Sequence, residues 1–371
     1  MNDQEPSKKK DLDRKLEKLR VKIDSVDEKL ISFLNQRAEI VKEIGKIKKD
    51  LGYNVFQPNR EKDIFQKLEQ EPSPLKFKSL KAIWKEIMAA SKELQGQIME
   101  VGYLGPKGTF THQAALKYFP KANTEFIACN NIDEIFRDIE KDILDFGAIP
   151  IENNLQGTVR ETLDLLIEKD LNIYGEIELR IIQNLISHKD AELSDIDKIY
   201  SHPQAFAQTR TWIKKHLPNA KLINTASTAE AVYKISSSDS KNIAAIGTDF
   251  AAKVYNLKLL RTKIEDHPSN FTRFLMISKQ ENEERNEKTK TSIVYVTKHK
   301  PGALYKVLKL FAEADINLMK IESRPRRKGR WEYIFLMDFE GDKNDKRVQK
   351  VFEDMKENVI WFKILGSYPI A

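Results

Sequence analysis

Along the first fifty residues, apolar residues recur every seven positions among charged ones. No proline follows Pro6 and the first glycine is Gly45, so this pattern predicts one helix from about Lys8 to Leu51. Such a helix would be roughly 60 Å long, too long for an ordinary globular core, so we expect it to need a partner. The recurring apolar residues form two sets: Leu16, Ile23, Leu30, Ile44 and Leu51, and Leu12, Leu19, Val26, Phe33, Ile40 and Ile47.

Arg37 falls in line with the first apolar set, where a guanidinium costs several kcal/mol unless an anion neutralises it. Lys48 follows eleven residues later on the same helix face, with roughly 16 Å between the two Cα atoms. The two cations are therefore spaced to hold an anion of benzoate size from both ends. Arg20 lies roughly 42 Å from Lys48 along the helix, so it would join the same site only from a second subunit.

The patterning divides the chain into three domains and a linker. Residues 8–98 are expected to be all helical, with a short helix from about Asn59 to Glu69 and a third helix with apolar residues on one face. Residues 100–279 alternate short strands with helices, which predicts an α/β domain. Residues 280–290 are a charged linker. Residues 291–371 follow the order βαββαβ, which predicts a ferredoxin-like domain.

Composition narrows the class of function. The chain has 371 residues and a formal net charge of +7, but acids and bases are interspersed, which favours a solvated surface and small anionic ligands over nucleic acid. A single cysteine, Cys129, excludes an intrachain disulfide and indicates a reducing compartment. Neither an apolar signal segment nor an 18-residue apolar run occurs, so we expect a cytoplasmic protein without membrane contact. The six histidines are scattered, and neither a metal nor a cofactor is expected.

Seven sequence strings identify a resemblance to a known family. In chain order they are GPKGTFTHQAA (105–115), PIENNLQGTV (150–159), YSHPQAFAQ (200–208), STAEA (227–231), NFTRF (270–274), KPGAL (300–304) and ESRP (322–325). The first five resemble prephenate dehydratase, and the last two resemble the phenylalanine-sensing ACT domain of the same enzymes. With the helical segment in front, the whole chain resembles a bifunctional chorismate mutase/prephenate dehydratase.

The resemblance implies that the helical domain is an interlocked homodimer that rearranges chorismate to prephenate. Its reaction is pericyclic, so catalysis comes from holding one substrate conformer and from donors to the ether oxygen where charge develops. Lys48 and Gln95 would be those donors, and Arg20 and Arg37 would hold carboxylates. The chorismate site implied by the family comprises Arg20, Arg37, Lys48, Arg60, Glu61, Ser91 and Gln95. Gln57 stands where a relative has an acid, so we leave it out of the site.

The implied dehydratase domain has two lobes, like a periplasmic binding protein, with prephenate between them. Its catalytic threonine corresponds to Thr272, which we expect to donate a hydrogen bond to the departing C4 oxygen, with Glu152 as a second catalytic residue. The remaining prephenate-binding residues would be Thr109, Asn153, Ser201, Gln208 and Arg273. Arg273 suits bidentate pairing with a substrate carboxylate, and the alternative is a structural salt bridge. His202, before Pro203, is expected to start a helix rather than to act as a base.

The implied ACT domain pairs with that of a second subunit and binds phenylalanine as an allosteric inhibitor. Gly302 would let the ligand approach the backbone, and the ESRP string would close the pocket. The phenylalanine-binding residues would be Gly302, Ala303, Leu304, Glu322, Ser323, Arg324 and Pro325.

Two other functions fit the middle domain. An arogenate dehydratase fused to a mutase differs only by an amino group on the substrate. A non-catalytic sensor of aromatic acids would use the same two-lobed fold, although Thr272, Glu152 and the mutase domain count against it.

Overall fold

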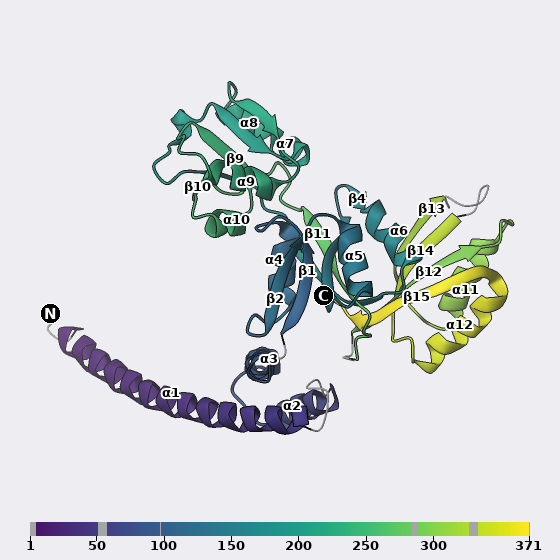
Figure 1. The fold of residues 1–371 in the computed structure, drawn as a ribbon, viewed down its shortest axis with the longest axis horizontal. Coiled ribbons are helices and arrows are strands. Elements are labelled where there is room, and N and C mark those ends of the chain that lie inside the picture. Colours follow the sequence, from purple (N-terminus) through teal and green to yellow (C-terminus); the bar gives the residue numbers. More distant parts are fainter. Residues whose placement is uncertain (1–4, 51–57, 97, 284–287, 326–332, 371) are drawn as a thin grey trace. The chain divides into compact units, whose positions relative to one another are not determined.

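The computed structural model describes residues 5–50, 58–96, 98–283, 288–325 and 333–370, with side chains from 12 to 48 and from 64 onward within these ranges (Figure 1). The chain divides into two compact units. The first comprises Met1–Ile98 with Pro120–Asn123, and the second comprises Met99–Phe119 and Thr124–Ala371.

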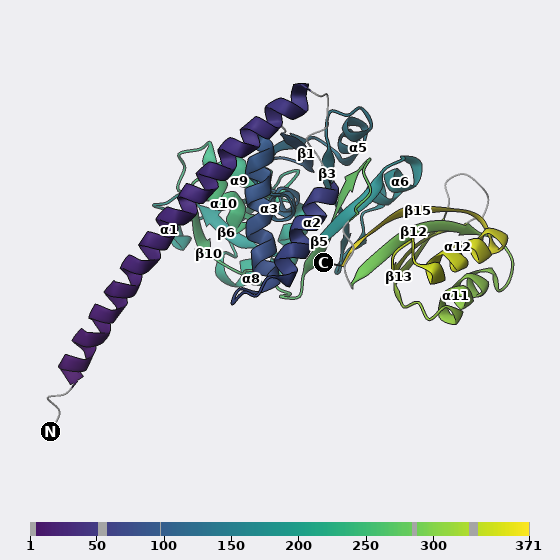
Figure 2. The same ribbon diagram turned by 90° about the horizontal axis from the view of Figure 1, so that it is seen from below.

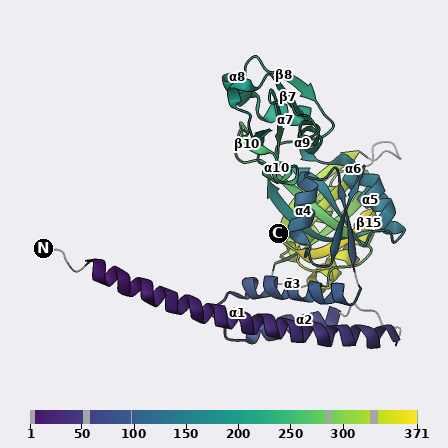
Figure 3. The same cartoon turned by 60° about the vertical axis from the view of Figure 1, so that its left-hand side comes forward.

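The first unit consists of three helices that run alongside one another (Figure 3): α1 (Glu5–Asp50), α2 (Pro58–Gln70) and α3 (Phe77–Leu94). Its small core includes Val41 of α1 and Met88 and Ala89 of α3. Helix α3 ends before Gly96, whose φ of 77° is the left-handed conformation that terminates helices. The long helix, the short second helix and the third helix expected from the sequence are thus confirmed.

Much of the apolar surface of α1 is exposed in the single chain. The helix extends past α2 and α3 at its N-terminal end (Figure 2), and its exposed side chains there include Leu12, Leu19, Ile23 and Val26, at 56–62% of their full area. These exposed residues belong to both apolar sets of the heptad pattern. Exposed apolar surface of this kind is typical of a helix that packs on a partner, and the partner expected from the helix length stays a prediction.

The second unit begins with a lobe built on a six-stranded sheet, in which β4 pairs with β3 beside the order β2-β1-β3-β11-β5. Strands β1, β2 and β3 are parallel, and α4, α5 and α6 connect them to the following strands. The lobe contains β1 (Met99–Leu104), α4 (Phe110–Tyr118), β2 (Thr124–Cys129), α5 (Ile132–Glu140), β3 (Phe146–Asn153), β4 (Gly157–Thr158), α6 (Arg160–Glu168), β5 (Asn172–Arg180) and β11 (Phe271–Ser278).

A second lobe is inserted between β5 and β11 and has its own five-stranded sheet in the order β10-β6-β9-β7-β8. It contains β6 (Asn184–Ser187), η1 (Leu193–Asp195), β7 (Lys198–Ser201), α7 (Pro203–Gln208), α8 (Arg210–His216), β8 (Lys221–Asn224), α9 (Thr228–Ser236), β9 (Ile243–Gly247), α10 (Asp249–Val254) and β10 (Lys258–Arg261). The chain then returns to the first lobe as β11, antiparallel to both β3 and β5. The expected two-lobed α/β architecture is confirmed.

The C-terminal domain confirms the expected βαββαβ order: β12 (Thr289–Thr297), α11 (Ala303–Glu313), β13 (Leu318–Pro325), β14 (Tyr333–Glu340), α12 (Lys346–Asn358) and β15 (Val359–Pro369). Its sheet has the order β13-β14-β12-β15. One face packs on α11 and α12 through residues such as Tyr295 and Met337. The other face contributes Val294, Leu336 and Tyr368 to the core of the first lobe.

The C-terminal end of the expected linker is part of this packed domain instead. Strand β12 begins at Thr289, and Lys290, which we expected in the linker, is 3% exposed. Asn282 is also buried and donates a hydrogen bond to the Tyr174 backbone oxygen. A run of charged residues reads as solvated, but two of its members are satisfied by groups far away in sequence. Residues 284–287 of the run lie outside the described residues.

Candidate active sites and effector site

Arg37 and Ser91, both expected in the chorismate site, are brought together in the helical unit. The Arg37 guanidinium of α1 donates to the Ser91 hydroxyl of α3, and that hydroxyl donates to the Ile87 backbone oxygen. Arg37 is half-buried and Ser91 is 8% exposed. The seam position of Arg37 therefore corresponds to the junction between two helices, where its charge is directed at α3.

Gln95 directly follows the last residue of α3, one turn beyond Ser91. Its side-chain nitrogen donates to the Ser91 backbone oxygen at 3.0 Å, while among the described residues its buried Oε1 has no donor. A Cβ at Gly45 of α1 would come within 2.9 Å of the Gln95 Cγ, so only glycine leaves this approach open. The two ends of a carboxamide exchange by rotation, so the unsatisfied position suits a hydrogen bond to a bound molecule.

Of the other residues considered for the chorismate site, the structure describes the side chains of only Lys48 and Arg20. Lys48 is half-buried near the end of α1, while Arg20 is exposed and pairs with Glu17 at 2.7 Å. Arg60 and Glu61 belong to α2, but their side chains lie outside the described residues, and Gln57 lies outside them altogether.

Thr272 of β11 lies directly opposite Asn153 of β3 in the sheet register. The Asn153 side-chain nitrogen donates to the Thr272 hydroxyl oxygen at 2.9 Å and to the Asn270 carboxamide oxygen at 2.7 Å. Because the threonine oxygen accepts from Asn153, its own proton is directed away from that amide and is available to a substrate. The NFTRF string was not expected to be a strand, and its strand pairing is what sets this geometry.

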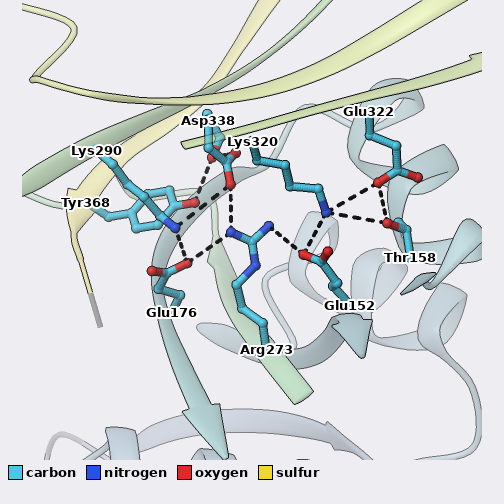
Figure 4. A network of polar contacts seen from close by, with 10 residues as sticks. Glu152, Thr158, Glu176, Arg273, Lys290, Lys320, Glu322, Asp338 and Tyr368 are labelled. Carbon is cyan, nitrogen blue, oxygen red and sulfur yellow. Dashed lines mark hydrogen bonds and ion pairs between the residues drawn. The ribbon is translucent and has the colours of Figure 1, made fainter. Parts of the chain in front are cut away.

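Glu152 and Arg273 are the next pair in the same register, and they are tied into ion pairs (Figure 4). Arg273 contacts Asp338 at 2.6 Å, Glu176 at 3.5 Å and Glu152 at 3.6 Å. Burial alone would lower the pKa of Arg273. The nearby Asp338, with Tyr368 and Glu176, outweighs burial and raises the pKa above its ordinary value. Of the two explanations left open by the sequence, the structure thus shows the salt bridge.

Three other expected prephenate ligands use their side chains within the protein. The Thr109 hydroxyl caps α4 by accepting from the His112 backbone and donates to the Leu104 backbone oxygen at 2.8 Å. Ser201 is fully buried and donates to the Ile246 backbone oxygen, and Gln208 accepts from Gln183 at 3.1 Å. Their roles toward prephenate remain predictions.

His202 begins a helix, as expected. Its Nδ1 accepts the Gln204 backbone N–H at 3.2 Å, and Pro203 occupies the first turn of α7. A ring nitrogen engaged in a cap supports the structural role over that of a base.

A hollow of ≈ 520 Å³ in the C-terminal domain surrounds the KPGAL string. Gly302 has a φ of 77° at the start of α11, a conformation that favours glycine, and a Cβ there would meet no atom within 4 Å. The expected ligands Gly302, Ala303 and Leu304 all line this hollow, with Thr297, Lys298, His299, Lys300, Pro301, Tyr305, Tyr333 and Phe335.

The ESRP string, expected to close the phenylalanine pocket, has its side chains on two faces of β13. Along β13, Glu322 and Arg324 face the middle domain of the same chain: Thr158 donates to Glu322, and Arg324 pairs with Asp164 at 2.8 Å. Ser323 and Pro325 lie on the opposite, exposed face and pair in register with Phe335 and Tyr333 of the hollow. Side chains alternate along a strand, so one string serves two surfaces. None of these four residues lines the hollow within the described chain.

The sequence reading missed Asp338, Glu176, Lys290 and Lys320, which surround Arg273 and Glu152. Asp338 carried a usable signal, since it is the single acid within the apolar run YIFLMDF of β14. The charged run that contains Lys290 gave no sequence signal for a buried ion pair.

Three family models match the chain: chorismate mutase type II over residues 19–96, prephenate dehydratase over 101–282 and the ACT domain over 291–357. Together with the fold, they define a multidomain enzyme with two catalytic domains and an ACT domain. A bifunctional chorismate mutase/prephenate dehydratase of Aquifex aeolicus (strain VF5) is 40% identical over 361 residues, covering 96% of this chain and 98% of the relative. One of Pseudomonas aeruginosa is 39% identical over 364 residues, with the same coverage.

The chain belongs to the family of bifunctional chorismate mutase/prephenate dehydratases, and these matches support both activities. Among solved structures, the prephenate dehydratase of Arthrobacter aurescens in complex with L-Phe has a TM-score of 0.67 at 34% identity, covering 74% of this chain and 90% of that one. The prephenate dehydratase of Staphylococcus aureus has a TM-score of 0.64 at 31% identity, covering 73% and 100%.

Among the described residues, no helix is long and apolar enough to cross a bilayer. No cluster of three or more potential metal ligands occurs among them either.

Proposed function

We propose that this cytoplasmic chain rearranges chorismate to prephenate in its helical domain and converts prephenate to phenylpyruvate in its middle domain, under inhibition by phenylalanine at the ACT domain. The observation that carries the dehydratase half is the Thr272 hydroxyl, whose acceptor side is occupied by Asn153. For the mutase half it is the convergence of Arg37, Ser91 and Gln95 at the junction of α1 and α3.

In the mutase step, no group of the protein needs to form a covalent bond. Arg37 and Arg20 hold the two substrate carboxylates, and Lys48 and Gln95 donate to the ether oxygen as the C–O bond breaks. The donor position of Gln95 requires its carboxamide to present nitrogen to the ligand, which the unsatisfied Oε1 position supports. Arg60, Glu61 and Ser91 complete the proposed site.

In the dehydratase step, the ring carboxylate leaves as CO₂ and its electron pair enters the ring as the C4 oxygen departs. Thr272 donates a hydrogen bond to that oxygen and lowers the cost of the developing negative charge. Glu152 and Asn153 border the threonine in the sheet, and Thr109, Ser201 and Gln208 are assigned to the rest of the pocket. Arg273 reaches a substrate carboxylate only if it loosens its hold on Asp338.

The proposed phenylalanine site is the hollow at Gly302, Ala303 and Leu304, completed by the ESRP string of a second copy. Ser323 and Pro325 lie on the exposed face of the edge strand β13, beside Met319 and Ile321 at 42% and 45% exposure. An exposed edge strand with apolar side chains is suited to pairing with a second ACT domain. Glu322 and Arg324 then connect the effector site to the middle domain of their own chain.

A second copy is also proposed for the mutase domain, because Arg20 is too far from Lys48 on one helix and the apolar surface of α1 is exposed. The homodimer, or a larger homo-oligomer, would bury that surface.

The test is to supply purified full-length protein with chorismate, prephenate and arogenate separately. We expect turnover of the first two, with phenylalanine suppressing phenylpyruvate formation. A preference for arogenate over prephenate would contradict the proposed substrate, and binding of prephenate without turnover would indicate a sensor.

A further inference from the structure

A continuous cluster of seven charged side chains joins the ACT domain to the catalytic strands of the same chain (Figure 4). Its cations are Arg273, Lys290 and Lys320, and its carboxylates are Glu152, Glu176, Asp338 and Glu322. Beyond the contacts of Arg273, Lys290 lies 2.6 Å from Glu176 and 3.8 Å from Asp338, while Lys320 lies 2.7 Å from Glu152 and 3.3 Å from Glu322.

Burial makes this cluster sensitive to position. The side chains of Asp338, Glu176 and Lys290 are 1–4% exposed. Asp338 also accepts from the Ser292 hydroxyl at 2.6 Å. Charges so far from water are tolerated only while their partners stay in place, so moving one strand by a fraction of the pairing distance forces the other strands to follow or the pairs to break.

At the catalytic end, the cluster is fixed to the two residues that set the threonine hydroxyl. Arg273 is the neighbour of Thr272 on β11, and Glu152 is the neighbour of Asn153 on β3. A displacement of either charged side chain therefore acts on the strand segment that carries the Asn153–Thr272 hydrogen bond. It also decides whether the Arg273 guanidinium is held by Asp338 or is free to meet an anionic substrate.

At the effector end, the cluster shares strands with the hollow around Gly302. Asp338 lies on β14, which also carries the hollow-lining residues Tyr333 and Phe335. Lys320 and Glu322 lie on β13, the strand of the ESRP string, which pairs with β14. A ligand that moves β13 and β14 thus moves the acid and the lysine that hold Arg273 and Glu152.

We propose that Asp338 and Lys320 are positioning residues through which the ACT domain controls the dehydratase site of its own chain. Phenylalanine favours the arrangement in which Asp338 keeps Arg273 and Lys320 keeps Glu152, so that both are withheld from prephenate. Without the effector, Arg273 and Glu152 exchange these ion-pair partners for prephenate. The ligand acts only through its different affinity for these two arrangements. This inference rests on the proposed function and adds to it the route of inhibition.

The test uses the full-length variants Asp338→Asn and Lys320→Gln, with Glu340→Gln as a matched control. Glu340 is an exposed acid two residues beyond Asp338 on β14. Dehydratase turnover is followed against phenylalanine concentration, and phenylalanine binding to the free protein is measured by calorimetry. Allosteric coupling typically changes affinity by about 5- to 150-fold. We expect both variants to lose most of that factor, seen as a rise of roughly 10-fold in the half-inhibitory concentration. Calorimetric affinity should weaken by no more than the same factor, because the variants destabilise the arrangement that phenylalanine prefers, and the control should be inhibited normally.

Inhibition of both variants at the wild-type concentration would overturn the inference. So would loss of phenylalanine binding in Lys320→Gln, since the lysine would then belong to the effector pocket, or equal relief in Glu340→Gln. If Asp338→Asn does not fold, the half-buried Lys320 still decides the outcome. Failure of the proposed function is distinct, because the wild-type protein itself would then lack dehydratase turnover or inhibition by phenylalanine.

Discussion

The Thr272 hydroxyl has its hydrogen-bonding direction set by one neighbour. Asn153 donates to its oxygen at 2.9 Å, and Asn153 is itself held by Asn270 and the Phe271 backbone oxygen. A threonine hydroxyl is too weak an acid to protonate a leaving group alone. In the proposed dehydratase step, it acts instead as a positioned donor that stabilises the charge growing on the departing oxygen.

We therefore predict that Thr272→Ser, which keeps the hydroxyl, retains most dehydratase turnover, whereas Thr272→Val, which keeps the shape, loses on the order of 10² or more. Phenylpyruvate formation from supplied prephenate is the measurement. Chorismate consumption should be normal in both variants, because the mutase residues lie in the separate helical unit. Equal rates for the two variants would show that the position supplies packing rather than a hydrogen bond.

His112, in the GPKGTF string region, gives a pH-dependent contribution to stability. It is 4% exposed, stacks on Tyr103 with ring centroids 4.2 Å apart, and accepts the Gly108 N–H through Nδ1. Burial, with a smaller effect of Lys107, lowers the pKa of His112 from 6.5 to about 4. Above pH 6.5 the ring is neutral in both states. Between 6.5 and 4 only the unfolded chain takes up the proton, so falling pH destabilises the fold.

The predicted loss reaches roughly 3 kcal/mol near pH 4 and is absent above pH 7. His112→Gln keeps an acceptor for Gly108 but does not titrate, so its unfolding midpoint should fall less steeply than that of the wild type between pH 7 and 4.5. The difference between the two profiles removes the contribution of other acids. Parallel profiles would contradict the assignment.

The elements show how far sequence reasoning reached. The heptad pattern predicted a helix from about Lys8 to Leu51, and α1 spans Glu5–Asp50. An arginine on an apolar seam also signalled a real junction, because local periodicity determines which residues share a helix face. By contrast, the partners of Arg273 come from β3, β5 and β14, 65 residues away in the case of Asp338, and no local pattern encodes such pairing.

Strand alternation divides the ESRP string between two surfaces. We expected the whole string to close the phenylalanine pocket, which stays a prediction, and successive side chains of β13 point to opposite faces. Glu322 and Arg324 therefore meet the middle domain, while Ser323 and Pro325 are left for another surface. A sequence motif predicts the family, whereas the strand pairing shows on which face of the sheet each side chain lies.

At the junction of α1 and α3, Gly45 leaves the space that Gln95 occupies. A Cβ there would meet the Gln95 Cγ at 2.9 Å. Glycine in a helix interior costs about 1 kcal/mol relative to alanine, so a larger residue at this position should not weaken α1 itself. We predict that Gly45→Val displaces Gln95 and lowers mutase turnover by roughly 10-fold or more, given the usual worth of a positioned donor. The rate of chorismate consumption is the measurement.

Lys46→Val is the matched control for that experiment, because Lys46 is exposed on the adjacent position of α1 and the valine is the same. Its mutase rate should stay near that of the wild type. A normal rate in Gly45→Val would show that Gln95 tolerates displacement and would remove it from the catalytic residues.

For the whole molecule, the proposed second copy would cover the apolar surface of α1 and complete its site. Its exposed apolar residues extend from Leu12 to Ile47, and Arg20 and Lys48 lie roughly 42 Å apart on the one helix. Each site of a dimer with two-fold symmetry would then take Arg20 from one subunit and Lys48 from the other. The isolated Arg20→Ala and Lys48→Ala proteins should each be nearly inactive as mutases.

Mixing the two variant proteins should restore activity as subunits exchange. In a heterodimer, one site combines both mutated positions while the other has both wild-type residues, so half of its sites are intact. With random exchange, half of the dimers are mixed, and about a quarter of the wild-type mutase rate should return. Dehydratase turnover, which uses separate residues, should remain constant throughout and normalise the protein concentration. If exchange is demonstrated by mass and chorismate consumption stays at the level of the single variants, then Arg20 and Lys48 serve the same subunit's site, or Arg20 lies outside it.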